Sequence, residues 1–359
     1  MDVRDFDFDL PAALIAQEPS ADRSAARLLH LDRVTGAVAH GRFAALPERL
    51  SAGDLLVVNN TRVFPARLLG RRVPTGGAVE CLLIRRCDGE HWEALVHPGQ
   101  KLKPGEQVIF EGPPSRVPRF GAAGPHSLRA EILERRFHGR RLIRLWTDGT
   151  AAVDEAVDAI GHVPLPPYIR RADRESDRGR YQTMFAARRG SIAAPTAGLH
   201  FTESVTEALR VRGVQIAAIT LHVGYGTFQP VRTERIEEHR LDAERYEVDA
   251  AAAQAVNAAL DEGRRVIAVG TTTTRTLEAV AAANGGRLAA GAGQTDLFIF
   301  PAFQFQVIRG LVTNFHLPQS SLLMLAAAFA GREQLLAAYR EAIDERYRFY
   351  SYGDAMLIL

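Results

Sequence analysis

Apolar positions follow two different periods along the chain, and the change of period divides the sequence into three stretches. Residues 1–65 and the C-terminal half mix apolar strands with amphipathic helices, which is typical of a sheet covered by helices. Between them, residues 66–149 show only short strand patterns separated by Gly and Pro turns. This order predicts an α/β domain formed by 1–65 and 150–359, with a mixed, barrel-like or largely parallel sheet. A smaller all-β antiparallel barrel domain, 66–149, is inserted into it.

Individual elements can be placed from periodicity and end signals. Two strands, Arg27–Asp32 and Ala37–Phe43, flank a turn, and Asp54–Val58 is a buried strand. Thr202 is the predicted N-cap of one helix, and Gly213 ends it. That helix is Glu203–Arg212, and further helices are predicted at Ala250–Glu262, Thr274–Ala283, Ser321–Ala330 and Glu333–Arg346. Strands are predicted at Val214–Leu221, Arg265–Val269, Asp296–Phe300 and Leu311–Phe315. The predicted barrel strands are Ala78–Arg86, His91–His97, Gln107–Phe110, Leu128–Phe137 and Arg141–Trp146, with a loop at 112–126.

Composition excludes several classes of protein. The 359 residues are 47% hydrophobic and 24% charged with a net charge of +2, so there is no global polyanion-binding signature. No apolar run has the length of a membrane span, and the acidic start Met1–Asp9 is not a secretory signal peptide. Cys81 and Cys87 cannot form a disulfide framework. We therefore expect a cytoplasmic protein with reduced thiols and no membrane association.

Polar residues gather at five boundaries between predicted elements, and open α/β sheets bind ligands at such boundaries. The clusters are Asn59–Arg62, Ala194–Thr202, Leu221–Pro230, Val269–Thr276 and Thr313–Ser321. Their candidate binding residues are Asn60, Arg62, Thr196, Gly198, Gly224, Tyr225, Thr271, Thr272, Arg275, Asn314, Ser320 and Ser321, and their histidines are His200, His222 and His316. Taken alone, each cluster is weak evidence for a site, and a capped helix or a histidine satisfied in the core is the favoured interpretation of Val269–Thr276 and Thr313–Ser321. The threonine run lacks the spacing of a phosphate-binding P-loop.

Metal and hydrolase chemistry are not supported by the spacing of these residues. His200, His222, His239 and His316 fall on different elements, without a His-x-x-x-His pair or a cysteine partner, so no metal site is predicted. Ser320 and Ser321 follow a proline turn and lack the Gly-x-Ser-x-Gly elbow of a serine hydrolase. One of these two serines is the predicted N-cap of the apolar helix that follows.

Several longer motifs carry a resemblance that extends over nearly the whole chain. In order, they are Asp5–Leu10, Asn59–Arg62, Tyr181–Thr183, Pro195–Thr202, His222–Phe228, Thr295–Ile299, Thr313–Pro318 and Tyr347–Ile358. Together they resemble the S-adenosylmethionine:tRNA ribosyltransferase-isomerase family of queuosine biosynthesis. Two departures are local: His239–Asp242 stands where the family usually has His-x-Met-His, and Pro301–Phe303 stands where Pro-Gly-aromatic is usual.

The resemblance implies an unusual use of S-adenosylmethionine as a ribosyl donor. The implied acceptor is the aminomethyl group of a 7-deazaguanine in the tRNA anticodon wobble position, and adenine and methionine leave as epoxyqueuosine forms. It implies no metal or redox cofactor, with S-adenosylmethionine as substrate and the tRNA anticodon stem-loop as partner. We expect the enzyme to be a monomer.

Such a site must move protons beside a sulfonium and stabilise departing adenine. Within the resemblance, His316, His222 and His200 are the candidate catalytic residues, because histidine transfers protons near neutral pH. Asn314, Thr196 and the run beginning at Thr271 and Thr272 would hydrogen-bond the nucleoside. Arg62 and Arg275 would meet phosphate or the methionine carboxylate, and Tyr225 would stack on a base or face the sulfonium. A non-catalytic RNA-binding module and a nucleoside-cleaving transferase that works without tRNA remain the alternatives.

Overall fold

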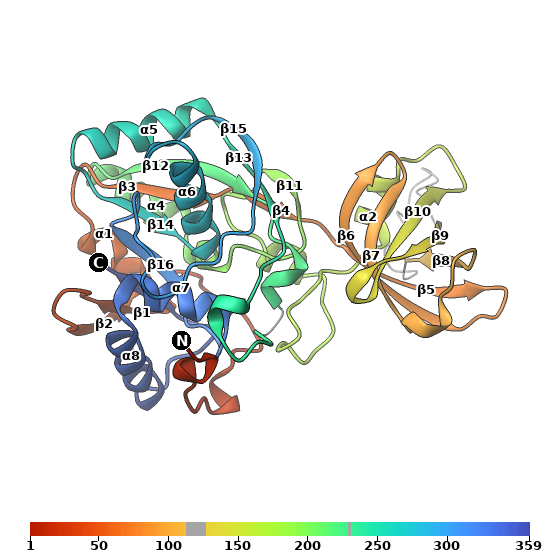
Figure 1. Cartoon of the computed structure of the whole chain (residues 1–359), viewed down its shortest axis with the longest axis horizontal. Coiled ribbons are helices and arrows are strands. Elements are labelled where there is room, and N and C mark those ends of the chain that lie inside the picture. Colours follow the sequence, from red (N-terminus) through yellow and green to blue (C-terminus); the bar gives the residue numbers. More distant parts are fainter. Residues whose placement is uncertain (113–126, 229–230) are drawn as a thin grey trace. The chain divides into compact units, whose positions relative to one another are not determined.

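The computed structural model describes residues 1–112, 127–228 and 231–359 (Figure 1). Their contacts define two units. The α/β unit comprises Met1–Arg62, Pro167–Arg171 and Arg180–Leu359, and the barrel unit comprises Val63–Pro166 and Ala172–Gly179. Apart from Gly112, the loop predicted at 112–126 lies outside the described residues.

A nine-stranded mixed sheet forms the centre of the α/β unit. Its strand order is β15 (Gly291–Thr295), β13 (Glu244–Val248), β12 (Gln215–Leu221), β3 (Leu55–Asn59), β14 (Val266–Val269), β16 (Gly310–Asn314), β17 (Ala355–Ile358), β1 (Arg27–Leu31) and β2 (Val38–Arg42). β12, β3, β14 and β16 run parallel, whereas β17 is antiparallel to β16. The predicted α/β class with a mixed sheet is confirmed.

Alternate residues of the central strands face two different helical layers. In β3, Leu55 and Val57 belong to the larger hydrophobic core, with α5 (Ala250–Asp261), α6 (Thr271–Ala283), α7 (Ser321–Ala330) and α8 (Arg332–Asp344). Leu56 and Val58 face the smaller core, with α1 (Leu46–Arg49) and α4 (Glu203–Val211). Because both faces of the sheet are covered, these strands read as continuous apolar runs rather than as alternating ones.

The barrel unit is a closed barrel of six antiparallel strands, which confirms the predicted antiparallel barrel. The strands are β5 (Arg67–Val73), β6 (Ala78–Asp88), β7 (His91–His97), β8 (Gln107–Glu111), β9 (Ser127–Arg135) and β10 (Arg140–Thr147). The helix α2 (Val153–Ile160) buries Ala156, Val157 and Ile160 and packs on β9 and β10. The chain therefore returns to the α/β unit later than residue 150. The minor elements are α3 (Asp177–Arg180) and a two-stranded sheet of β4 (Thr61–Val63) and β11 (Arg188–Ser191).

Several element predictions need correction, and β5, β13 and α2 were not predicted. The strand predicted at Asp296–Phe300 is wrong, because the edge strand is β15, where the ring of Tyr246 on β13 occupies the space that a side chain on Gly293 would need. Helix α6 begins at Thr271 rather than Thr274. The C-terminal strand β17 was not predicted, although it lies between β16 and β1 near the middle of the sheet.

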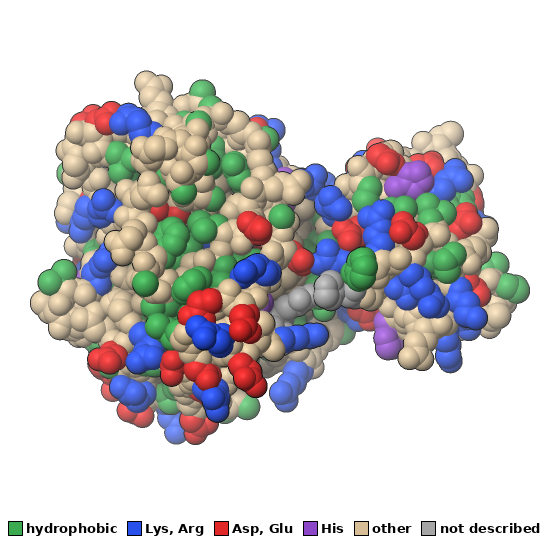
Figure 2. Space-filling model, in the orientation of Figure 1, with side chains coloured by type: hydrophobic (Ala, Val, Ile, Leu, Met, Phe, Trp, Pro, Cys, Tyr) green, Lys and Arg blue, Asp and Glu red, His purple; other side chains and the backbone are tan. Residues whose placement is uncertain are grey.

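The surface and the helix lengths add two observations. Figure 2 shows basic and acidic side chains interspersed over the visible face of the α/β unit. Among the described residues, no single helix is long and apolar enough to cross a membrane, and only α7 with α8, bent by 113° at their junction, passes on length and composition as a pair.

Candidate functional site

A cavity of about 550 Å³ lies in the α/β unit beside the carboxyl end of β16. Residues from several separate segments line it, including Thr196, Asn314, His316, Ser320 and Tyr350. Thr196 begins η7 (Thr196–His200), a short 3₁₀ helix, and Ser320 is the N-cap of α7. Three of the five predicted polar clusters therefore meet at one cavity, because Thr227 of the cluster Leu221–Pro230 also lines it.

Asn314 is held rigidly in the wall of this cavity. Its Nδ2 donates to Nε2 of His200 (3.0 Å) and to the carbonyl of Tyr350 (3.3 Å), and its Oδ1 accepts from the hydroxyl of Thr196 (3.0 Å). Both amide hydrogens are thus used within the protein, whereas Oδ1 and the Thr196 hydroxyl keep lone pairs. This wall accepts hydrogen bonds, which suits ribose hydroxyls or an amine.

His200 supports this arrangement from behind. It is buried and tilted against the ring of Phe43, with ring centroids 5.2 Å apart. Burial, together with the charges of Arg348 and Arg23, lowers its pKa to about 3. A neutral His200 leaves Nε2 free to accept from Asn314, so both the geometry and the pKa assign the proton to Nδ1. The predicted site residue His200 therefore contacts Asn314 and does not itself line the cavity.

His316 is the histidine that lines the cavity. Its Nε2 lies 2.8 Å from the hydroxyl of Thr313, and its backbone N–H donates to the hydroxyl of Tyr339 (2.9 Å). Burial lowers the pKa of His316 to about 3, so the ring is neutral near pH 7. Within the described chain, Nδ1 has no hydrogen-bond partner, which leaves that nitrogen available to a ligand.

An aromatic pair forms another part of the wall. The rings of Tyr168 and Tyr350 are stacked with centroids 4.4 Å apart, and both residues line the cavity. Tyr350 (φ 74°) and Gln319 (φ 58°), which also lines the cavity, adopt positive φ angles that are costly for side chains of their size. Strained backbone of this kind concentrates at functional sites.

Comparison with known proteins identifies the family to which this chain belongs. The family model described as queuosine biosynthesis protein matches residues 3–358. S-adenosylmethionine:tRNA ribosyltransferase-isomerases from Heliobacterium modesticaldum and Desulfitobacterium hafniense are 51% and 50% identical to this chain, each over the full length of both chains. The crystal structure of the S-adenosylmethionine tRNA ribosyltransferase of Thermotoga maritima is 38% identical, covers 99% of this chain and 100% of its own, and has a TM-score of 0.55. The chain belongs to the queuosine biosynthesis protein family.

Membership of this family of S-adenosylmethionine:tRNA ribosyltransferase-isomerases confirms the resemblance and makes the chain an enzyme. The comparisons do not assign roles to individual residues. The position of each candidate in the family fold must therefore decide which of them can act together.

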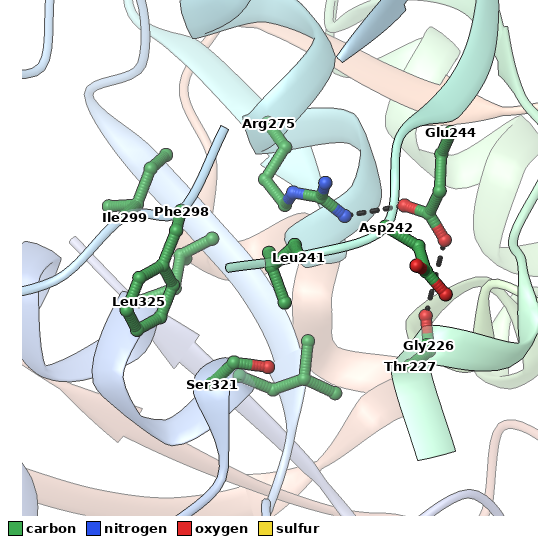
Figure 3. Close-up of a pocket in the computed structure, with 11 residues that line it drawn as sticks. Gly226, Thr227, Leu241, Asp242, Glu244, Arg275, Phe298, Ile299, Ser321 and Leu325 are labelled. Atoms are coloured by element: carbon green, nitrogen blue, oxygen red, sulfur yellow. Dashed lines mark hydrogen bonds and ion pairs between the residues drawn. The ribbon is translucent and has the colours of Figure 1, made fainter. Parts of the chain in front are cut away.

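Arg275 lies in a small niche that shares Thr227 and Leu322 with the main cavity (Figure 3). Its Nη1 donates to Glu244 Oε2 (2.5 Å), and its other nitrogens donate to the carbonyls of Leu297 and Thr295. Both ion-pair partners are buried. Each nitrogen of the guanidinium therefore already donates to a partner within the protein, so the predicted contact of Arg275 with phosphate or carboxylate would have to use its two remaining N–H groups.

The same ion pair fixes the glycine loop of the family motif His222–Phe228. Glu244 Oε1 accepts from the N–H of Gly224 (2.8 Å) and from the hydroxyl of Thr227 (3.3 Å), as Figure 3 shows for Thr227. Tyr225, half-buried, begins η8 (Tyr225–Phe228) in this loop. The predicted residues Gly224 and Tyr225 are thus anchored to α6 through Glu244 and Arg275.

His222 lies apart from the residues that line the cavity. Its Nδ1 is 2.8 Å from the hydroxyl of Thr61, and Gly190 packs so closely on its ring that a Cβ there would lie 2.7 Å away. Burial and the charge of Arg245 lower the pKa of His222. Near it, Asn60 accepts from the hydroxyl of Thr220 (2.6 Å), and Arg62 is exposed on β4. These residues form a second polar group that the structure does not bring to the cavity wall.

The remaining candidates have local structural partners. Thr271 and Thr272 are buried in the first turn of α6, and Thr272 accepts from Asn59 Nδ2 (3.2 Å). Gly198 is buried, and a Cβ there would lie 2.9 Å from Thr183, so close packing explains this glycine. Ser320 caps α7 by accepting from the N–H of Leu323 (3.2 Å), as predicted for Ser320 or Ser321. Ser321 lines the niche.

Sequence reasoning missed Tyr168 and gave no role to Tyr350. Tyr168 comes from the short return Pro167–Arg171, and Tyr350 from the turn before β17. Neither follows a polar cluster, so only the C-terminal family motif Tyr347–Ile358 offered a signal for Tyr350.

Proposed function

We propose that this enzyme transfers and isomerises the ribosyl group of S-adenosylmethionine. The acceptor is the aminomethyl group of 7-aminomethyl-7-deazaguanine in the tRNA anticodon wobble position, and the products are epoxyqueuosine in tRNA, adenine and methionine. The observation that carries the proposal is the cavity at the end of β16, with Asn314 and His316 in its wall, in a chain of this family. Its volume, about 550 Å³, suits a nucleoside-sized ligand.

His316 is the residue we assign to proton transfer. Its Nδ1 is unpaired within the described chain, and Nδ1 can act as the base in the tautomer whose Nε2–H donates to the hydroxyl of Thr313. A proton removed from a carbon beside the sulfonium leaves negative charge next to the newly formed imidazolium. The two charges stabilise each other, which offsets the burial that otherwise disfavours protonation.

The substrate would be bound, without any proton transfer, by Asn314, Thr196 and the tyrosine pair. The acceptor atoms Asn314 Oδ1 and Thr196 Oγ1 suit the ribose hydroxyls, and the face of a tyrosine suits a purine or a sulfonium. His200 acts through Asn314, because its neutral ring holds the amide in a single orientation. We propose that no metal or redox cofactor takes part, so a chelator should leave adenine release unchanged.

Adenine release from S-adenosylmethionine, with and without tRNA carrying 7-aminomethyl-7-deazaguanine, tests the proposal. Wild-type protein should release adenine only with the modified tRNA. His316→Ala should lower kcat by about 10²–10⁴-fold, the range for a lost general acid–base. His222→Ala is the matched control, since His222 is also partly buried but does not line the cavity.

The outcomes separate the alternatives. Release without tRNA would favour a nucleoside-cleaving transferase, and tRNA binding without release would favour an RNA-binding module. Activity within a few-fold of wild type in both histidine variants would overturn the proton-transfer assignment. A large loss of adenine release in His222→Ala alone would assign the reaction to the second polar group, around Thr61 and Asn60.

A further inference from the structure

The hairpin tip between β9 and β10 exposes an aromatic side chain that the barrel does not use. Phe137 begins η6 (Phe137–Gly139) at this tip and is 89% exposed, more than any other large hydrophobic side chain among the described residues. Its ring contributes nothing to the barrel core, which is filled by residues such as Ile132 and Ile143. An isolated exposed phenylalanine is unremarkable by itself, so its surroundings decide what it can do.

Those surroundings are basic. The tip reads Arg135-Arg-Phe-His-Gly-Arg-Arg141, with four arginines in seven residues. Arg135 is exposed, and no described acidic side chain pairs with it, while Arg136 is 3.5 Å from Glu134, an open and solvated pair. Figure 2 shows several Lys and Arg side chains on the visible face of the barrel unit. Two of the arginines are therefore available to an anionic partner.

The other two arginines hold the tip in shape. Arg140 pairs with buried Glu93 (3.4 Å). Arg141, itself buried, donates to the carbonyls of Gly139 (3.2 Å) and Gly99 (2.8 Å). Gly139 has φ 78°, so the turn is built on a conformation that favours glycine. Buried contacts therefore hold the tip in one conformation.

The bond to Gly99 also ties the tip to a second basic segment. Gly99 begins η4 (Gly99–Lys101), in the connection between β7 and β8. Lys101 and Lys103 are exposed there, and they are the only lysines of the 359-residue chain. One end of the barrel unit therefore combines an exposed aromatic ring with cations from two connections.

We propose that this barrel tip, Phe137 with Arg135 and Arg136, binds an unpaired base and the neighbouring phosphates of an RNA loop. An aromatic face stacks on any unpaired base, and arginine matches phosphate oxygens in pairs. A lipid surface or an apolar protein groove would need a broader apolar patch than one ring among cations. The identification of this RNA as tRNA rests on the proposed function. The stacking and phosphate contacts are argued from the barrel tip alone.

Three variants of the full-length protein test the proposal. Phe137→Ala removes the ring, Phe137→Trp keeps a stacking face, and Arg135→Ser with Arg136→Ser removes two charges. The matched control is Arg210→Ser, Val211→Ser, Arg212→Ser at the end of α4, where Val211 is 79% exposed between two exposed arginines. Binding is measured by fluorescence anisotropy with an RNA stem-loop that has an unpaired loop, and with the same stem closed into a full duplex.

Phe137→Ala should weaken binding of the stem-loop at least about fivefold, with Phe137→Trp close to wild type. The double serine variant should flatten the slope of log affinity against log salt by about 1.4–1.8, the loss of two phosphate contacts. The duplex should bind more weakly than the stem-loop and should not respond to Phe137→Ala. The control triple variant should change the stem-loop affinity less than the tip variants.

Failure of this inference is distinguishable from failure of the proposed function. If wild-type protein releases adenine with modified tRNA but the tip variants bind the stem-loop like wild type, the tip inference alone falls. Equal losses in the tip variants and the α4 control would also overturn it, since total charge would then explain binding. If the wild-type protein releases no adenine, the proposed function is refuted. The anisotropy measurements still show whether the barrel tip binds RNA. Self-association that Phe137→Ala abolishes, without any change in RNA affinity, would make the tip a protein interface and refute the RNA assignment.

Discussion

Two buried histidines should make the α/β unit lose stability as the pH falls. His200 and His316 are both neutral in the folded protein, because burial lowers the pKa of each to about 3 from an ordinary value of 6.5. In the unfolded chain the same rings take up a proton near pH 6.5. Between these two values the unfolded state binds more protons, so the free energy of unfolding decreases as the pH is lowered.

The magnitude follows from the two pKa values of each ring. Going from about pH 8 to about pH 5, a histidine with a folded pKa near 3 and an unfolded pKa near 6.5 costs about 2 kcal/mol of stability. The two rings together cost about 4 kcal/mol. This is a large part of the total stability of a typical domain, about 5–15 kcal/mol.

The perturbation that isolates this effect is His316→Asn, which removes one titrating ring from the cavity wall. Urea unfolding at about pH 8 and about pH 5 gives the stability difference for each protein, so any constant cost of the substitution cancels. Between the two pH values, the free energy of unfolding of the variant should fall by about 2 kcal/mol less than that of wild type. The helical circular dichroism signal follows the α/β unit, which holds α4 to α8.

The barrel unit provides an internal control. Both tryptophans of the chain, Trp92 and Trp146, lie in it, so tryptophan fluorescence follows the barrel transition. That transition should respond to pH equally in wild type and variant. If His316→Asn loses as much α/β stability as wild type between the two pH values, the folded ring takes up its proton as readily as the unfolded one. The lowered pKa of His316 would then be refuted.

Three further substitutions follow from particular contacts. Arg275→Met should destabilise the α/β unit by about 3–5 kcal/mol in urea unfolding, because it leaves buried Glu244 without its counter-charge, whereas Arg287→Met, at the exposed pair with Asp261, should change little. Asp249→Ala should cost about 1 kcal/mol, because its carboxylate caps α5 by accepting from the N–H of Ala252 (2.7 Å); an unchanged urea midpoint would contradict this. Gly353→Ala should lower both stability and adenine release, since a Cβ there would lie 2.4 Å from the carbonyl of Arg348 and would displace the turn that carries Tyr350; Gly41→Ala, whose Cβ would meet only the carbonyl of Leu28 at 3.9 Å, is the control.

Local signals in the sequence were sufficient for much of the fold. The apolar run Asp54–Val58 predicted a short strand, and β3 (Leu55–Asn59) lies near the middle of the sheet with residues in both hydrophobic cores. Thr202 is a predicted N-cap and does cap α4, and of the two predicted alternatives Ser320 and Ser321, Ser320 caps α7. In these cases the signal and the structure that it predicts lie within a few residues of each other.

Predictions failed where distant partners decide the local structure. β17 is a strand because β16 and β1 pair with it on either side, and residues 355–358 carry no sign of those partners. The start of α6 was missed because threonine is a weak helix former. In the structure, hydroxyls such as those of Thr273 and Thr274 bond back to the carbonyls of Val269 and Gly270 within the first turns of the helix.

The same distinction explains which candidate site residues come together. Thr196 and Asn314 were predicted from strand and helix ends, and their 3.0 Å hydrogen bond places both ends at one edge of the sheet. The sequence could not distinguish Arg275 from a ligand-binding arginine, because the buried carboxylate that pairs with it lies 31 residues away, on β13. A polar cluster at an element boundary therefore predicts where a site lies. It does not predict which of its side chains face the ligand, because that depends on buried partners contributed by other strands.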